Sequence, residues 1–235
     1  MTSTNTAPRK THIAPAPGLG ITHGETRTGS DGVLIAASVP PSGWVLWRDP
    51  QGQLHNPDGP AFYGFDGEQM WCHHGPKHRL DGPAHTDQFG VERFFVNGLA
   101  HRLDGPAVQG PAGTPWRSKE WFVDGKRHRV DGPAIDAVGG KEWFVDGKRH
   151  RLDGPAVEKD DGRREWWVDG KQHRTDGPAV VKANSGGEEW WLDGIRYADV
   201  WAWRDAGGTI PETPAAENTP PEVPAKARVG RRKAA

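Results

Sequence analysis

Cysteine, net charge and long apolar runs are nearly absent from this chain of 235 residues. The single cysteine, Cys72, excludes an intramolecular disulfide framework and fits a reducing cytosol. No apolar run approaches the length of a membrane span, and Met1 to Gly20 lacks the apolar core of a signal peptide. We therefore expect a cytoplasmic protein without a transmembrane segment.

Charge and sequence motifs exclude further classes. The 30 basic and 31 acidic residues nearly cancel, which gives little electrostatic steering and no strong signal for nucleic-acid binding. The chain contains no phosphate-binding glycine loop, dinucleotide fingerprint, nucleophile elbow or paired zinc motif. We expect a protein that is not an enzyme and has no cofactor. The low hydrophobic share, 34%, fits a thin sheet with little two-sided core.

What the chain does contain is a repeat. The motif His-x-x-Asp-Gly-Pro-Ala occurs six times, at steps of 23, 23, 27, 22 and 23 residues. Its histidines and aspartates are His55, His78, His101, His128, His150 and His173, followed by Asp58, Asp81, Asp104, Asp131, Asp153 and Asp176. A seventh copy begins at Trp190 and has Tyr197 where the histidine should be. A fixed period of this length is typical of a repeat architecture.

The unit Glu142 to Val157 predicts a β-hairpin. Trp143-Phe144-Val145 favours a strand, and Asp146-Gly147 is suited to a tight turn with positive φ. Asp153-Gly154 predicts a second turn, and Pro155 a strand start. With about two strands per repeat, the fold class is all-β. We predict an elongated, single-layer antiparallel β-meander of hairpin repeats, with atypical capping segments at both ends.

The pattern Glu-Trp-x-x-Asp-Gly-Lys-x-His, recurring over about residues 45–197, resembles the MORN repeat and its shorter bacterial and viral variants. It departs from the common MORN pattern by having Arg-x-Asp-Gly-Pro-Ala where that pattern has a glycine-rich run. The resemblance implies a twisted β-meander used as a scaffold or binding surface. Variants of this type include antitoxins, and lipid binding is not general in the family. Fold alone does not fix a function.

Three segments follow from composition. Residues 1–27 are expected to be flexible, 28–205 to form the repeat domain, and 206–235 to be a disordered, Pro-rich tail with a basic end. Val33 to Ala37 and Trp44 to Trp47 are strand candidates that cap the N-terminal edge. Asp199 to Trp203 is expected to form either a short capping helix or a last strand.

Three polar patterns are candidate sites. Six equivalent His/Asp pairs argue against catalysis, because an active site needs one asymmetric pocket; we expect each histidine to bond within its own Asp-Gly-Pro turn. Cys72, His74 and His78 could hold zinc but lack paired spacing, so no metal site is predicted. An arginine row that could bind a polyanion is interpreted as a solvated edge: Arg79, Arg102, Arg129, Arg151 and Arg174.

Two aromatic columns precede the histidines. The first shares its strand face with valines and is expected to be the core side: Trp71, Phe94, Trp121, Trp143, Trp166 and Trp190. The second forms a stripe bordered by carboxylates: Cys72, Phe95, Phe122, Phe144, Trp167 and Trp191. Such a stripe is either sheet packing or a partner surface, and both can hold at once. Trp116, in the longest insertion, is a further binding candidate.

We therefore expect a non-catalytic scaffold that binds a protein through the aromatic and acidic face. One alternative is an antitoxin or immunity-type protein that neutralises a toxin. Another is a lipid- or polyanion-binding repeat protein. The partner could also be a second copy of the chain, as a homodimer.

Overall fold

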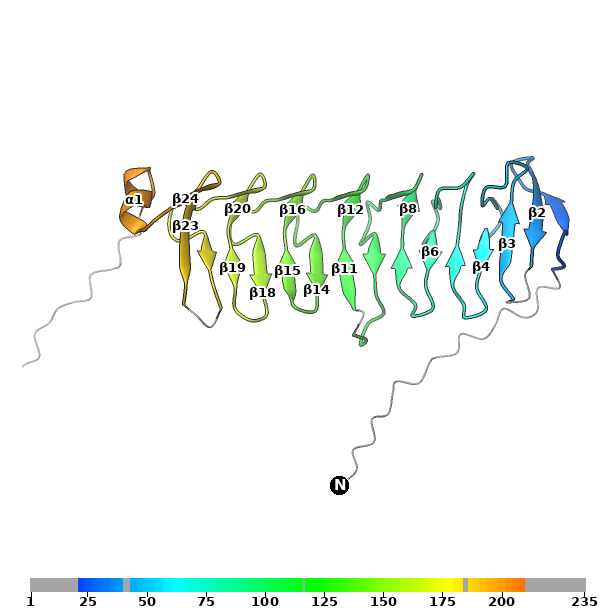
Figure 1. Ribbon diagram of the computed structural model, residues 1–235, viewed down its shortest axis with the longest axis horizontal. Coiled ribbons are helices and arrows are strands. Elements are labelled where there is room, and N and C mark those ends of the chain that lie inside the picture. The colour runs from blue at the N-terminus through cyan, green and yellow to red at the C-terminus, as the bar shows by residue number, and fades with distance from the viewer. Residues whose placement is uncertain (1–20, 40–42, 116, 184–185, 210–235) are drawn as a thin grey trace, which may run out of the picture.

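The computed structural model describes residues 21–39, 43–115, 117–183 and 186–209. The predicted all-β meander is confirmed: the chain forms one long open antiparallel sheet of 16 strands, and neighbouring strands follow one another along the sequence (Figure 1). The predicted flexibility of residues 1–20 and of 210–235, and the predicted binding role of Trp116, fall outside the described residues.

The N-terminal part of the main sheet starts with a three-stranded cap and continues through the first repeats. Its strands are β1 Thr26–Thr28, β2 Leu34–Ser38, β3 Val45–Arg48, β4 Phe62–Tyr63, β5 Gln69–Met70, β6 His85–Thr86 and β7 Glu92–Arg93. The two predicted capping strands are therefore present as β2 and β3, and β1 extends into the segment expected to lack structure.

The later repeats add strands to the same sheet in pairs. These strands are β10 Val108–Gln109, β11 Ser118–Glu120, β14 Ile135–Ala137, β15 Gly140–Glu142, β18 Val157–Lys159, β19 Arg164–Glu165, β22 Val180–Val181, β23 Glu188–Leu192 and β24 Ile195–Tyr197. The register is regular, with Ile135 opposite Glu142 and Glu142 opposite Val157.

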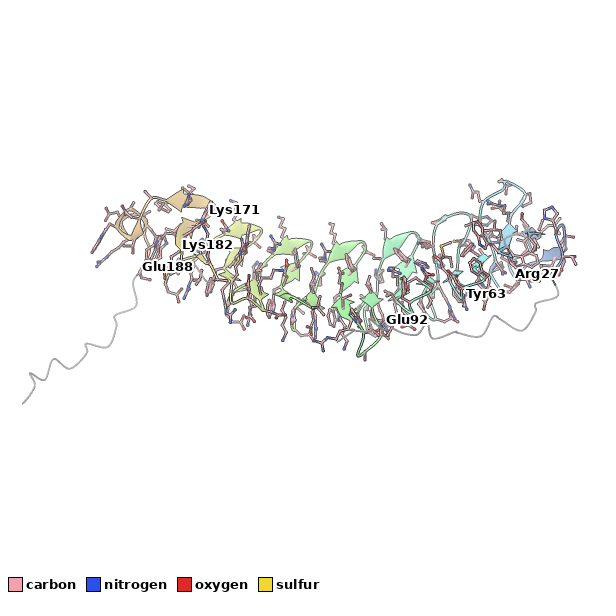
Figure 2. All side chains as sticks on the ribbon, turned by 60° about the horizontal axis from the view of Figure 1, so that its bottom comes forward. Arg27, Tyr63, Glu92, Lys171, Lys182 and Glu188 are labelled. Carbon is pink, nitrogen blue, oxygen red and sulfur yellow. The ribbon has the colours of Figure 1, made fainter. Side chains whose placement is uncertain are left out.

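Each central repeat also has a second, smaller hairpin, whose Asp-Gly or Asn-Gly turn was predicted but whose polar second strand was not. These hairpins are β8 Phe95–Val96 with β9 Leu99–Ala100, β12 Phe122–Val123 with β13 Lys126–Arg127, β16 Phe144–Val145 with β17 Lys148–Arg149, and β20 Trp167–Val168 with β21 Lys171–Gln172. They line one long edge of the ribbon (Figure 1). Lys171 on β21 lies at that edge, whereas Glu92 on β7 lies nearer the opposite one (Figure 2). A central repeat thus has four short strands where the sequence predicted about two.

The turns of the small hairpins have the predicted chemistry. Asp146 has a φ of 50° and Gly147 a φ of 80°, and the Asn-Gly and Asp-Gly pairs at the equivalent positions of the third and later copies adopt the same angles within a few degrees. Two consecutive residues with positive φ match the twist of a two-residue hairpin loop, and Asp-Gly and Asn-Gly are the pairs that tolerate it.

The core along the ribbon is a row of alanines. The alanine of each Asp-Gly-Pro-Ala motif is 0% exposed: Ala61, Ala84, Ala107, Ala134, Ala156 and Ala179. The Ala61 carbonyl accepts from the Trp47 N–H, and each later one accepts from a first-column residue, as Ala156 does from Trp143 at 2.8 Å. His150 N–H then donates to the Trp143 carbonyl at 3.2 Å. This row joins the loops to the sheet with little apolar volume, which explains the low hydrophobic share.

Both ends carry larger side chains. At the N-terminal end, Ile35, Ala37, Val45 and Trp47 form a buried cluster. At the C-terminal end, the helix α1 Val200–Asp205 begins after Asp199, whose carboxylate accepts from the N–H groups of Trp201 and Ala202. Of the two predicted forms for this segment, the structure has the helix, and its Trp203 is fully buried.

Candidate functional site

The arginines of the repeated loop stack on the first-column rings. Arg151 Cζ lies 4.0 Å from the centre of the Trp143 ring. The same contact recurs at 3.9–4.1 Å for Arg79 on Trp71, Arg102 on Phe94, Arg129 on Trp121 and Arg174 on Trp166. In the first copy Arg27 of β1 takes this place, 4.3 Å from the centre of the Trp47 ring. The first column is therefore half-buried beneath cations.

The arginines also donate hydrogen bonds within their own loops, and Arg151 Nη1 donates in addition to Glu158 Oε1 on β18 at 2.8 Å. Arg151 Nε donates to Asp153 Oδ1 at 2.8 Å, and its Nη1 donates to the Pro155 carbonyl at 3.1 Å. The bond from arginine lowers the pKa of Asp153, and equivalent bonds lower the pKa of Asp81, Asp104 and Asp131. Because ring, carboxylate and carbonyl occupy the guanidinium, this row is structural. The interpretation as a solvated cationic edge is wrong.

The histidines do not bond their own aspartates, which corrects the expected local turn bond. Each points to the small-hairpin turn of the next copy: His150 Nδ1 lies 2.9 Å from Asp169 Oδ1 and 3.2 Å from the Asp169 backbone nitrogen. His101, His128 and His173 lie in the same way against Asp124, Asp146 and Asp193. A ring nitrogen cannot donate and accept at once, so each tautomer makes one of the two bonds. The motif joins neighbouring repeats.

The residue between the arginine and the aspartate is apolar and exposed. Leu80, Leu103 and Leu152 are each 80% exposed, and Val130 is 82% exposed. They occupy one position in four consecutive copies, so they form a row, which we name the leucine row. The signal is present in the sequence as a recurring apolar residue inside a charged turn, and it was not predicted as a site.

Grooves separate neighbouring loops on this face. One is lined by the loop of Arg151 to Pro155, by Trp166 and Val168, and by the next loop from His173 to Asp176. An equivalent groove lies between the loops of the first and second copies, with Trp71 in its lining. A partner that covers the leucine row would therefore meet both exposed apolar side chains and ring surfaces.

The second aromatic column is less exposed than a binding stripe requires. Phe144 is buried at 9% exposure, and Phe95, Phe122, Trp167 and Trp191 are half-buried. Cations from the small hairpins lie beside the rings: Arg149 Cζ is 5.7 Å from the centre of the Phe144 ring and 5.3 Å from that of Trp167. The expectation of an exposed ring is wrong for Phe144.

The carboxylates beside this column are paired. Glu142 accepts from Arg149 Nε and Nη2 and from Lys159 Nζ. Burial alone would raise the pKa of Glu142, but these bonds outweigh it and the pKa is lowered. Trp167 Nε1 donates to Glu165 Oε2 at 2.9 Å. The column is an interlocked ladder of rings, arginines and carboxylates, which supports the sheet-packing interpretation.

The three residues that could hold zinc by their sequence pattern, Cys72, His74 and His78, do not form one cluster. Cys72 is a buried free thiol whose pKa burial raises, and His78 Nδ1 accepts from the Asn97 N–H. His74 instead lies in a cluster with Asp31, His55 and His73. Asp31 and His55 were missed because they lie far from His74 in the sequence.

Comparisons with protein-family models, with curated proteins and with solved structures give no match. The resemblance to the MORN repeat therefore stays a prediction. Within the described ranges, no helix has the length and apolar character needed to cross a membrane.

Proposed function

We propose that this protein is a non-catalytic, cytoplasmic repeat scaffold that binds a protein partner along the leucine row. The observation that carries the proposal is the repeated exposure of Leu80, Leu103, Val130 and Leu152 at about 80%. Burying one such side chain contributes roughly 1.5–3 kcal/mol, and several at a fixed spacing act together.

The surroundings of the row favour a protein over a lipid surface or a polyanion. The aspartate after each apolar residue is exposed, with 83% of the Asp81, Asp104 and Asp153 side chains open to solvent. Exposed carboxylates repel anionic lipids and phosphates, whereas the neighbouring arginines are already engaged. The face thus favours a partner whose apolar side chains are flanked by basic ones. A toxin neutralised in this way belongs to the same class of partner.

The repeat spacing sets the shape of the bound segment. Each copy adds two strands to the main sheet, so equivalent residues are about 10 Å apart. An extended chain rises about 3.3 Å per residue, so every third side chain meets a new copy. We propose a partner with an extended segment of this periodicity, docked in the grooves between loops.

The test uses a variant in which Leu80, Leu103, Val130 and Leu152 are all changed to serine. The immobilised parent chain captures a partner, which is then identified, purified and titrated against parent and variant. We expect the variant to bind at least roughly tenfold more weakly while its unfolding free energy stays within about 1 kcal/mol of the parent.

A matched control changes three exposed lysines of the small hairpins, Lys126, Lys148 and Lys171, to glutamine. This control should bind like the parent. If the serine variant binds the partner as tightly as the parent does, the leucine row is not the binding face. If the parent binds lipid vesicles and no protein, the partner is not a protein. Light scattering of the purified parent shows whether a second copy is the partner.

A further inference from the structure

Four side chains converge where the N-terminal cap meets the first two copies. Asp31 lies in the turn between β1 and β2, His55 in the first loop, and His73 and His74 in the turn of the second copy. One ligand atom from each lies within 4.8 Å of those of the other three. His55 Nε2 is 2.8 Å from Asp31 Oδ2, and His73 Nε2 is 3.9 Å from the same oxygen.

The cluster exists because this turn departs from the other copies. At the two equivalent positions the third copy has Val96 and Asn97, and the later ones have a valine, or Leu192 in the seventh copy, followed by an aspartate. His74 keeps the left-handed backbone of that position, with a φ of 47°. Side chains do not alternate across such a turn as they do along a strand, so His73 and His74 reach the same cluster.

The N-terminal cap positions the carboxylate of Asp31. The Ser30 N–H donates to Asp58 Oδ2 at 3.0 Å, which ties the turn of Asp31 to the first loop. Gly29 packs so closely on Pro57 that a side chain there would overlap its ring. Asp31 is thereby held over His55, which is 0% exposed.

Hydrogen bonds set which ring nitrogens are free. His74 Nδ1 lies 2.8 Å from Asp49 Oδ2, a fully buried carboxylate, so Nδ1 donates and Nε2 keeps its lone pair. This carboxylate–histidine pair is the arrangement that orients metal-binding imidazoles. His55 Nδ1 accepts from the His74 N–H at 3.1 Å, so its neutral ring carries the proton on Nε2.

His55 Nε2 is left without a well-directed acceptor. It is close to Asp31 Oδ2, but outside hydrogen-bond geometry, and it is buried. A buried polar atom without an aligned partner destabilises a fold, so a small shift of Asp31 that aligned its carboxylate with His55 Nε2–H would stabilise the cluster. The observation indicates that a further group belongs beside Asp31.

The groups around the cluster give the charge of the missing group. Asp31 Oδ2 lies 2.8 Å from His55 Nε2 and 3.9 Å from His73 Nε2, and the buried Asp49 lies 2.8 Å from His74 Nδ1. A carboxylate and imidazole nitrogens brought within 4.8 Å of one another are the donor atoms that a transition-metal cation accepts. The cluster therefore favours a cation.

We propose that Asp31, His73 and His74 bind one divalent transition-metal ion, of the Zn²⁺ class, with His55 Nε2–H holding the carboxylate as a positioning residue. Imidazole and carboxylate are ligands that Zn²⁺ accepts at about 2.0–2.2 Å. Ligand atoms around a tetrahedral ion lie about 3.4 Å apart, so the exposed His73 and Asp31 side chains need only close in slightly. The ion ties the N-terminal cap to the second copy and keeps a coordination position open for water or a partner's donor atom.

The test titrates Zn²⁺ into the full chain after removal of metal with a chelator. We expect one equivalent to bind and to raise the melting temperature. Co²⁺ should bind the metal-free chain with the visible absorption of a four- or five-coordinate site, and added Zn²⁺ should displace it. Mg²⁺, which prefers oxygen ligands, should have no effect at the same concentration.

The matched variant is His73→Val with His74→Asn, which installs the two residues of the third copy. It should stay folded, with the melting temperature of its metal-free form lowered by the loss of the bond to Asp49, and adding Zn²⁺ should no longer raise that temperature. Its Zn²⁺ affinity should fall at least roughly tenfold. His101→Gln removes an ordinary turn histidine and should leave Zn²⁺ binding unchanged. Absence of stoichiometric binding to the parent, or equal binding to the double variant, overturns the proposal.

Discussion

The guanidinium of Arg151 stacks on Trp143, with 4.0 Å between Cζ and the ring centre. Its other face lies against Gly154, where a built Cβ would be 3.0 Å from Cζ. Gly154 does not have a positive φ, so the glycine is needed for space and not for backbone freedom. The same close approach recurs at Gly82, Gly105, Gly132 and Gly177. The Arg-x-Asp-Gly-Pro motif therefore holds its arginine against the aromatic ring of the first column.

We predict that Gly154→Ala destabilises the protein by about 1–3 kcal/mol, because the new methyl group pushes the guanidinium off Trp143. Urea unfolding of the parent and the variant measures the difference. In an Arg151→Ala background the same substitution should cost less than half as much, since the group it displaces is gone. Equal costs in both backgrounds would show that the glycine serves the backbone instead.

Sequence patterns predicted those features that depend on local chain geometry. Asp146-Gly147 predicted its turn, and Asp199 to Trp203 predicted a cap, because both depend on backbone preferences of adjacent residues. The arginine stack was missed because nothing in the period says where a long side chain points. The buried alanines, such as Ala156, were missed because their burial depends on neighbouring repeats.

The candidate sites show the same limit. His150 was assigned to Asp153, three residues away, yet its partner is Asp169 in the next repeat. The His74 cluster needs Asp31, which the cap brings from 43 positions away in the chain. Contacts between repeats are non-local, and the left-handed backbone of His74 breaks the side-chain alternation that holds along a strand.

The arginine–aspartate bonds predict an acid-sensitive fold. The pKa of Asp81, Asp104, Asp131 and Asp153 is lower in the folded chain, mainly because an arginine donates to each carboxylate. Their stabilisation is therefore complete above the ordinary aspartate pKa of about 3.9 and is lost as pH falls through the folded values.

Melting temperatures measured from pH 7 to pH 3 check this. A variant with all four aspartates changed to asparagine should melt lower than the parent at pH 7 and lose less on acidification. Glu188→Gln, at an exposed position of β23, should keep the parent's pH profile. If the four-fold variant shows the parent's full acid loss, other carboxylates are responsible.

The histidine contact predicts coupling between repeats. His150→Ala and Asp169→Asn should each destabilise the chain, and the two together by less than their sum, because both remove one contact. A double-mutant cycle in urea should give a coupling of about 0.5–1.5 kcal/mol. Asparagine suits the left-handed position, as Asn97 shows with a φ of 50°. His128→Ala should cost about as much as His150→Ala, and a loss peculiar to one histidine would contradict a purely structural role.

The C-terminal cap predicts where the tail becomes dispensable. The Thr209 N–H donates to the Thr175 carbonyl at 2.6 Å, its hydroxyl donates to the same oxygen at 2.9 Å, and the Gly208 N–H donates to Trp203. Trp203 packs on Trp190 with ring centres 4.7 Å apart, and its Nε1 donates to the Arg174 carbonyl. A cut at 206, where composition places the tail, therefore removes residues that bond the last repeat.

We expect a chain ending at Thr209 to melt within about a degree of the parent, whereas one ending at Asp205 should melt several degrees lower. Trp203→Ala in the full chain should cost about 3–5 kcal/mol, because it empties a fully buried site and exposes the last repeat. Differential scanning calorimetry of the three variants measures these differences. If the two truncated chains melt together, the contacts of Gly208 and Thr209 contribute nothing, and Trp203 alone holds the cap.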